Sequence, residues 1–289
     1  MDPCDDEAHA GFHLQSIDVP HAMRPYVRGL VGVEIAKAGP LPLAIVPHES
    51  LVLCVQLGRG RDPLDQKSRF GRNTCLTGIR QWTGAFCGAG NCVSLFALLT
   101  PLGSVQLLDS RPLERAPRIR ACVAELLDDR LTRRLESDIA VHPALDCRLR
   151  AFGAWLEERA FAHRRLDAAA LRAARAAMRL CDEPGAAVDG LAAEQHVSRR
   201  QLERDFRQWI GTSPRHLSQV ARVQAISRRG RAGATLADIA ADLGFADQAH
   251  MSRVVRTLTG LTPGHYARGR RSSLGRAFGA ITGGGTVYL

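Results

Sequence analysis

Apolar and polar positions follow two different rhythms in the two halves of this 289-residue sequence. In the first half, short apolar or alternating runs are separated by Gly, Pro and Asn, a pattern typical of strands joined by turns. These runs occupy 12–20, 27–36, 41–58, 74–79 and 92–103. Helical spacing follows at 118–129 and at 143–161, where Leu145, Leu149 and Leu156 share one face. Strands followed by helices predict an α+β domain.

The second half contains a pair of short helical patterns in "TLADIAADLGFADQAHMSRVVRTLTGLTP" (235–263). Thr235 is placed to cap a first helix, whose apolar residues then fall on one face. Gly244 suits a left-handed turn, and Asp247 can cap a second helix with a polar outer side. Two helices joined by a short turn with glycine are typical of a helix-turn-helix motif.

The same pattern occurs a second time, earlier in the chain. A shift of 49 residues places Gly211 on Gly260, and before the turn the shift is 48, so the second turn has one extra residue. In the earlier copy Ser198 is the expected helix cap and Gln201 occupies the capping-box position. Between the copies a helix is predicted over 214–230. At about 1.5 Å per residue it is long enough to set the two units about one DNA turn apart.

Residues 167–269 resemble the DNA-binding domain of the AraC/XylS family of bacterial transcription regulators. The matching segments are "SRRQLERDFR" (198–207), "GTSP" (211–214), "LADIAADLGFADQAHMSR" (236–253) and "TGLTPGHY" (259–266). The resemblance implies seven helices, with two helix-turn-helix units bridged by a linker helix. His196, Met251, Val255 and Ile226 depart from the family pattern. The apolar exchanges predict a repacked core, and His196 can adopt a left-handed turn conformation at some cost.

The second helix of each unit carries the expected DNA contacts, because residues three and four apart share a helix face. The residues expected to read bases are Arg200, Gln201, Glu203, Arg204, Gln248, Ala249, Ser252 and Arg253. Arg pairs well with guanine and Gln with adenine, Glu accepts from cytosine, and the Ala methyl packs on thymine. The residues expected to contact phosphates are Arg199, Arg207, Arg222, His250 and Arg256.

The charge of the chain is concentrated in the same region. Residues 164–289 hold 20 Arg, no Lys and 10 Asp and Glu, which gives a net charge of +10, whereas residues 1–163 hold 19 basic and 19 acidic residues. GC-rich coding would explain the choice of Arg over Lys but not this asymmetry. A basic region with a DNA-reading pattern predicts double-stranded DNA as the partner.

The domain boundaries follow from these patterns. We expect a regulatory domain over 1–163, which binds an effector or mediates dimerisation, an AraC-type DNA-binding domain over 164–270, and a mobile Gly-rich tail over 271–289. In the family that the chain resembles, the first half is a cupin-like β-barrel with trailing helices, and 46–58 and 98–108 resemble the sensing halves of some members. The expected fold is therefore a cupin-like sensor domain followed by an all-α domain of seven helices.

Targeting signals and bound cofactors are not expected. The acidic start has no apolar segment and no run of eighteen apolar residues occurs, which favours a cytoplasmic protein without a membrane span. All eight cysteines precede residue 182 and are expected to be reduced. His48 lacks a second His pair for a metal site, and the spacing of Cys87 and Cys92 fits no common zinc site. We predict neither a metal nor a cofactor.

A candidate effector pocket is drawn from His48, Trp82, Phe86 and Phe96, although aromatic residues among strands are more often part of the core. The favoured function is a non-enzymatic transcription regulator that responds to a small molecule. RNA polymerase and a second copy of the chain are its further expected partners.

Two other functions are compatible with a basic helix-turn-helix region, and the sequence disfavours both. The first is an adaptive-response DNA alkyltransferase fused to the same module. It would need paired zinc-binding cysteines, which Cys87, Cys92, Cys122 and Cys147 do not offer, and a Pro-Cys-His-Arg motif, which is absent. The second is a non-specific nucleoid-coating protein, which is disfavoured because Glu203 is a poor choice on a face that only attracts phosphate.

Overall fold

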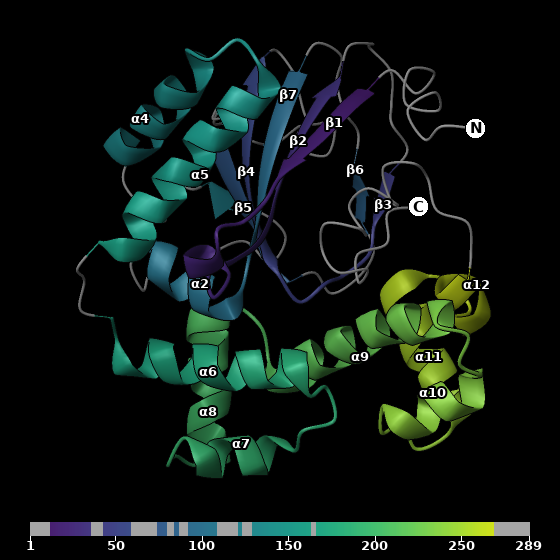
Figure 1. Cartoon of the computed structure of the whole chain (residues 1–289). Coiled ribbons are helices and arrows are strands. Elements are labelled where there is room, and N and C mark those ends of the chain that lie inside the picture. Colours follow the sequence, from purple (N-terminus) through teal and green to yellow (C-terminus); the bar gives the residue numbers. More distant parts are fainter. Residues whose placement is uncertain are drawn as a thin grey trace.

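A β-sheet with flanking helices makes up the N-terminal half of the molecule, and a row of helices makes up the C-terminal half (Figure 1). The computed structural model describes residues 12–35, 43–58, 74–79, 84–86, 92–108, 121–122, 129–162 and 166–268. The predicted α+β class, with strands first and helices second, is confirmed.

The main sheet is antiparallel throughout, with the strand order β1-β2-β7-β4-β5-β8. Its strands are β1 (Phe12–Ile17), β2 (Val27–Ile35), β4 (Leu51–Gly58), β5 (Thr74–Thr77), β7 (Cys92–Leu99) and β8 (Ala121–Cys122). A second pair joins β3 (Leu43–Ile45) to β6 (Gly84–Phe86). β7 lies between β2 and β4 and is buried along nearly its whole length, which explains its almost continuous run of apolar residues.

Three helices accompany the sheet: α2 (Pro101–Leu107), α4 (Asp129–Ala140) and α5 (Leu145–Phe161). α5 confirms the helix predicted over 143–161, and it packs on β1 and β2. The prediction over 118–129 is wrong at Ala121 and Cys122, which pair with β5 as strand β8. Sheet pairing at these two residues overrides the local helical spacing, and residues 123–128 of the predicted helix lie outside the described residues.

Helix α2 was not expected from the sequence, which was interpreted there as the end of a strand. Thr100 caps it by accepting a hydrogen bond from the Gly103 backbone N–H, and Pro101 fills the first helical position. A Cβ at Gly103 would lie 1.9 Å from the backbone oxygen of Tyr26, so only glycine fits. The helix is short and mostly buried, and it therefore lacks the apolar stripe of a surface helix.

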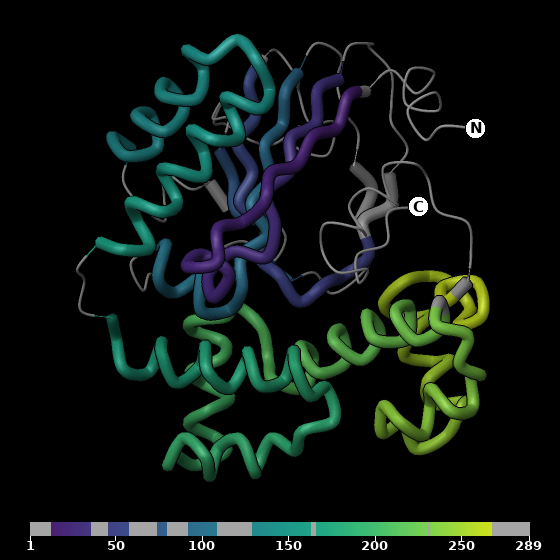
Figure 2. Tube along the Cα trace, in the orientation of Figure 1, coloured from purple at the N-terminus to yellow at the C-terminus, as the bar shows by residue number. Residues whose placement is uncertain are grey.

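The C-terminal half contains the seven α-helices that the resemblance implied. They are α6 (Ala168–Asp182), α7 (Val188–Glu194), α8 (Arg199–Asp205), α9 (Pro214–Arg231), α10 (Leu236–Asp242), α11 (Gln248–Thr259) and α12 (Pro263–Arg268). A single π-helical turn, η3 (Phe206–Ile210), continues α8. The α7–α8 and α10–α11 pairs lie at opposite ends of α9 (Figures 1 and 2).

The linker helix α9 begins as predicted and runs slightly further. Ser213 caps it by accepting from the His216 N–H at 3.2 Å, and Pro214 is its first residue. Gly230 does not end the helix, which continues to Arg231. A Cβ at Gly230 would lie only 2.5 Å from the Cβ of Ala267 in α12, so this glycine permits the close packing of α12 on α9.

The two halves of the chain are in direct contact. α6 packs on α2, and the buried Gln224 of α9 donates from Nε2 to the Pro47 carbonyl at 2.6 Å. Glu49, also buried, forms ion pairs with Arg28 of β2 at 3.3 Å and with Arg228 of α9 at 3.6 Å. Within the part of the chain that the structure describes, no helix is both long and apolar enough to cross a bilayer.

Candidate nucleic-acid interface

The turns of the two units have the same backbone geometry. His196 has a φ of 54° and Gly244 a φ of 67°, so both occupy the left-handed region, as predicted for His196. The next residue closes each turn in the same way. Val197 donates to the Ala192 carbonyl at 3.0 Å, and its counterpart Phe245 donates to the Ala240 carbonyl at 2.9 Å. The repeat seen in the sequence is therefore a repeat in three dimensions.

Side-chain caps start the second helix of each unit. Ser198 accepts from the Gln201 N–H at 3.2 Å, and Asp247 accepts from the His250 N–H at 2.5 Å, which confirms both expected caps. The capping box expected in the first unit does not form, because the Gln201 side chain donates to Asp205 at 2.6 Å instead of turning back to Ser198. In a capping box the Gln201 oxygen would accept from the Ser198 backbone N–H, and here that oxygen accepts from the Arg204 guanidinium.

Four apolar residues fix the rotation of the two reading helices, since Leu202, Phe206, Met251 and Val255 are all fully buried, as predicted. The expected base readers therefore lie on the opposite side. Exposed among them are Arg200, Arg204, Gln248, Ala249 and Arg253, and half-buried are Gln201, Glu203 and Ser252. The orientation that base reading requires is present in both units.

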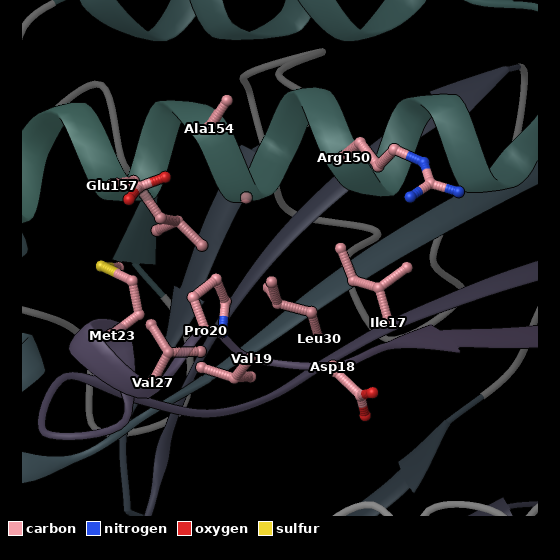
Figure 3. Close-up of a pocket in the computed structure, with 12 residues that line it drawn as sticks. Ile17, Asp18, Val19, Pro20, Met23, Val27, Leu30, Arg150, Ala154 and Glu157 are labelled. Atoms are coloured by element: carbon pink, nitrogen blue, oxygen red, sulfur yellow. The ribbon is translucent and has the colours of Figure 1, made fainter.

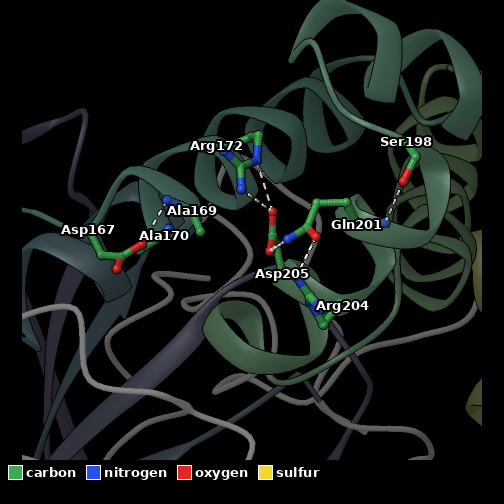
Figure 4. A network of polar contacts seen from close by, with 8 residues as sticks. All are labelled: Asp167, Ala169, Ala170, Arg172, Ser198, Gln201, Arg204 and Asp205. Atoms are coloured by element: carbon green, nitrogen blue, oxygen red, sulfur yellow. Dashed lines mark hydrogen bonds and ion pairs between the residues drawn. The ribbon is translucent and has the colours of Figure 1, made fainter.

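The first unit carries a polar network behind its reading face (Figure 4). Asp205, only 1% exposed, accepts two bonds on Oδ2 from Arg172 of α6 at 2.9 and 2.7 Å, and one on Oδ1 from Gln201. The Gln201 amide oxygen in turn accepts from the Arg204 guanidinium. Sequence reasoning missed Arg172 and Asp205 as functional candidates. Their only signal was a carboxylate four residues after Gln201 on the helix.

The reading face of the second unit is less constrained. The Ser252 hydroxyl donates to the Gln248 carbonyl at 2.8 Å, so it is engaged by its own helix. His250 accepts from the Ala246 N–H at 3.4 Å and stacks edge-on against Phe245. Among the contacts of the described residues, the Arg253 guanidinium has no partner. Its contact with a base stays a prediction.

The expected phosphate contacts differ in how they are held. Arg207 and Arg256 are exposed and occupy equivalent positions in the two units. Arg199 pairs with Glu203 at 3.0 Å and Asp189 at 3.3 Å, and these carboxylates raise the pKa of its guanidinium. Glu203, expected to accept from a cytosine, is thus engaged by Arg199 in the absence of DNA.

The Arg222 side chain makes its contacts inside the protein. Its Nε donates to the Pro184 carbonyl at 3.0 Å, its Nη1 donates to the Gly244 carbonyl at 3.2 Å, and it lies over the Phe245 ring. Burial lowers the pKa of its guanidinium. Arg222 therefore connects the turn of the second unit to the loop after α6, and its contact with phosphate stays a prediction.

Only part of the expected effector pocket falls within the described residues. His48 accepts from the Ser50 N–H at 3.1 Å, and Phe96 is a half-buried residue of β7. Trp82 lies outside the described residues, and for Phe86 only the backbone in β6 is described. Their common role stays a prediction.

A cavity of about 450 Å³ lies elsewhere, between α5 and the segment that joins β1 to β2 (Figure 3). Its apolar lining includes Met23, Val27 and Leu30, and its charged lining residues are Asp18, Arg150 and Glu157. Gly153 of α5 also lines it, and a Cβ there would meet Leu30 at 3.4 Å and Ile17 at 3.7 Å. Within the described ranges, no three His, Cys, Asp or Glu side chains are grouped to hold a metal ion.

Comparisons with known proteins bear on the C-terminal half first. Residues 191–269 match a family model described as a helix-turn-helix domain, of the AraC type. No curated protein matches the sequence.

Solved structures to which the chain shows a partial likeness include ToxT from Vibrio cholerae, with 12% identity and a TM-score of 0.41 over 89% of this chain and 98% of that one. ToxT of strain SCE256 with a bound unsaturated fatty acid has 11% identity and a TM-score of 0.40, over 89% and 94%. The AraC-like transcriptional activator CuxR has 11% identity and a TM-score of 0.23, over 77% and 89%. At these values the likeness assigns neither a ligand nor a target to this chain.

Proposed function

We propose that this chain, a DNA-binding transcription regulator with an AraC-type helix-turn-helix domain at 191–269, reads an operator with α8 and α11 and responds to a small molecule bound by its N-terminal half. The observation that carries the proposal is the repeated unit. Two turns of the same geometry, two capped helices and two outward arginines, Arg204 and Arg253, stand at opposite ends of one linker helix. Successive major grooves on one face of DNA offer a matching pair of sites.

The chemistry of the two faces supports direct reading of bases. Arg204 and Arg253 are exposed, and a guanidinium can donate two parallel hydrogen bonds to a guanine edge. The exposed Arg207 and Arg256 are placed one helical turn further along, where they would neutralise phosphates. The net charge of +10 on residues 164–289 supplies the long-range attraction.

The experiment that tests this function is selection of bound sequences from a random DNA library by the full chain. Two recognised blocks about 10 base pairs apart are expected, one for each reading helix. Recovery of DNA without sequence preference would contradict the proposal and would return the chain to the class of non-specific DNA-coating proteins.

For the effector, the cavity beside α5 is the best-supported site. Its volume of about 450 Å³ lies within the range of small-molecule pockets. The lining is largely apolar, and of its three charged residues Asp18 and Glu157 are acidic, while Arg150 already pairs with Asp146 at 3.4 Å. The two acidic side chains in an apolar lining favour a largely apolar molecule that has one positively charged group. Gly153→Leu should fill the cavity and abolish the response to such a molecule, with Gly153→Ala as the milder control.

Control of DNA binding by the effector requires a connection between the halves, and the contacts of α9 supply a candidate. Gln224 and Arg228 are one helical turn apart on α9 and contact Pro47 and Glu49. A movement of the 46–50 segment would therefore act directly on the helix that spaces the two units. RNA polymerase and a second copy of this chain are the further partners that we propose.

A further inference from the structure

We propose that Asp205 is a positioning residue for base reading by the first unit: it fixes the Gln201 amide, which in turn holds Arg204 in place for DNA. The inference rests on the proposed function, because it presupposes that Arg204 reads a base. It changes the role of Gln201, which was expected to read adenine and which here orients its neighbour instead.

The contacts form one unbroken chain from α6 to the reading face (Figure 4). Arg172 of α6 donates to Asp205 through Nε at 2.9 Å and Nη2 at 2.7 Å. Gln201 donates from Nε2 to the other oxygen of the same carboxylate at 2.6 Å, and its Oε1 accepts from Nη2 of Arg204. Asp205 and Gln201 are thus each bound on both sides, and the exposed Arg204 is the end of the network on the reading face.

The chemistry of the groups fixes the direction of each hydrogen bond in this network. An ionised carboxylate only accepts hydrogen bonds and a guanidinium only donates them. The Gln201 amide, which has one end of each kind, must therefore turn its NH₂ toward Asp205 and its oxygen toward Arg204. A flipped amide would place its oxygen against the carboxylate and its NH₂ against the guanidinium, and both contacts would become repulsive.

Burial makes the arrangement persistent. Asp205 is 1% exposed, and an unpaired carboxylate at that depth is strongly disfavoured, so the Arg172 pair and the Gln201 bond are both retained. A surface arginine otherwise samples many rotamers, and ordering it opposes binding. Holding Arg204 before DNA arrives reduces that cost. Gln201 already uses one N–H for Asp205 and one acceptor position for Arg204, and these two bonds fix the direction of its amide.

The second unit has an equivalent reading arginine but no buried carboxylate at the position that corresponds to Asp205. Residue 254 is the counterpart of 205 at the shift of 49, and it is Val254. Among the described residues Arg253 has no partner for its guanidinium, whereas Arg204 is held by Gln201. The chain therefore contains one positioned and one unpositioned arginine at equivalent sites, which provides an internal control.

The test uses the full chain with Asp205→Asn, Gln201→Met and, in the second unit, Val254→Ala as the matched control. Asn preserves the shape at 205 but can also donate, so the direction of the Gln201 amide is no longer fixed. Binding is titrated against operators mutated one base pair at a time. We expect Asp205→Asn and Gln201→Met to reduce discrimination at the base pairs read by the first unit about tenfold. The second half-site should be unaffected, and Val254→Ala should leave both unchanged.

The outcomes separate the two proposals. If Arg204→Ala loses discrimination while Gln201→Met and Asp205→Asn keep it, the positioning role is wrong and the proposed function stands. If Arg204→Ala keeps the wild-type preference at every position, the proposed function of that residue fails first. Should Asp205→Asn fail to fold, Gln201→Met decides alone, because Gln201 is half-buried and its apolar replacement removes the amide hydrogen bonds while Asp205 keeps its ion pair with Arg172. If Gln201→Met loses the base preference of the first unit and Gln201→Glu retains it, the proposal is also contradicted, because a carboxylate at 201 cannot donate to Asp205.

Discussion

The two helix-turn-helix units have the same turns, caps and buried contacts, but they hold their reading arginines in different ways. In the first unit, Arg204 is tied through Gln201 to the buried Asp205, and the α-helix gives way to the π-helical turn η3 directly after that residue. In the second unit, α11 is a continuous α-helix and Arg253 is free among the described contacts. The residues that the two copies share specify the fold of a unit. The residues that differ determine whether the reading arginine is hydrogen-bonded to its own helix.

The largest effect should come from the residues that make the units alike. Leu202→Ala and Met251→Ala each remove a fully buried side chain from equivalent positions, and each should lower the free energy of unfolding by about 2–5 kcal/mol. Denaturant unfolding of the full chain measures the loss. Footprinting at a permissive temperature should show that each variant weakens protection in its own half-site. Equal weakening of both half-sites by either variant would mean that the units do not bind independently.

The next effect tests the readers themselves. Arg204→Ala and Arg253→Ala should each cost about 1–3 kcal/mol of binding on the operator and relax the preference at one or two base pairs. The two variants should affect different blocks, about 10 base pairs apart. A titration against an operator library measures both. If each variant loses the same affinity on every sequence, these arginines contact phosphates and our assignment of base readers is wrong.

Substitutions in the two turns should change the stability of the protein by smaller amounts and in opposite directions. His196 is the non-glycine residue with positive φ among the described residues, whereas Gly244 meets the same demand without a side chain. His196→Gly should therefore stabilise the protein by about 0.5–1 kcal/mol, and Gly244→Ala should destabilise it by about 1 kcal/mol. Thermal unfolding of both variants measures the difference. A destabilised His196→Gly would indicate that the imidazole makes a contact that outweighs the backbone strain.

The smallest effect concerns the phosphate contacts and is expected to be the same in both units. With about six to eight phosphate contacts, the logarithm of the affinity should fall with the logarithm of salt concentration with a slope on the order of −5 to −7. Arg207→Ala and Arg256→Ala should each make that slope less steep by about 1. Binding titrations at several salt concentrations measure it. A wild-type slope near −1 would contradict the role given to the basic half.

The features that the sequence predicted best are those that neighbouring residues determine. Caps such as Ser198 and Asp247, and the left-handed turn at His196, depend on contacts within four residues and follow from residue type. The bond between Arg172 and Asp205 joins residues 33 apart on different helices, and nothing in local spacing indicates it. The outward face of each reading helix could be predicted because apolar residues such as Leu202 and Met251 fix the rotation of the helix. The contacts that the outward side chains make with other residues could not be predicted.

The N-terminal half was predicted less completely for a related reason. Its long strands and α5 follow from apolar patterns, but α2 is buried on most sides and has no amphipathic period to reveal it. At Ala121 and Cys122 the helical spacing was misleading, because pairing with a distant strand decided the local conformation. The cavity beside α5 joins residues of two regions more than 100 positions apart, such as Ile17 and Glu157, and only the folded chain brings them together.

The length of the 18-residue helix α9 determines how far the second unit is rotated relative to the first. Each residue in an α-helix turns the chain by about 100° and advances it about 1.5 Å, so one inserted alanine in α9 would swing the second unit about a quarter of a revolution away from the groove. Seven inserted residues complete almost two revolutions and restore the facing, at a cost of about 10 Å of extra reach. Because the major groove returns to the same face of DNA only once per turn of about 34–36 Å, the extra 10 Å would carry the second unit past its groove. Such a variant should therefore protect the first half-site and lose protection of the second.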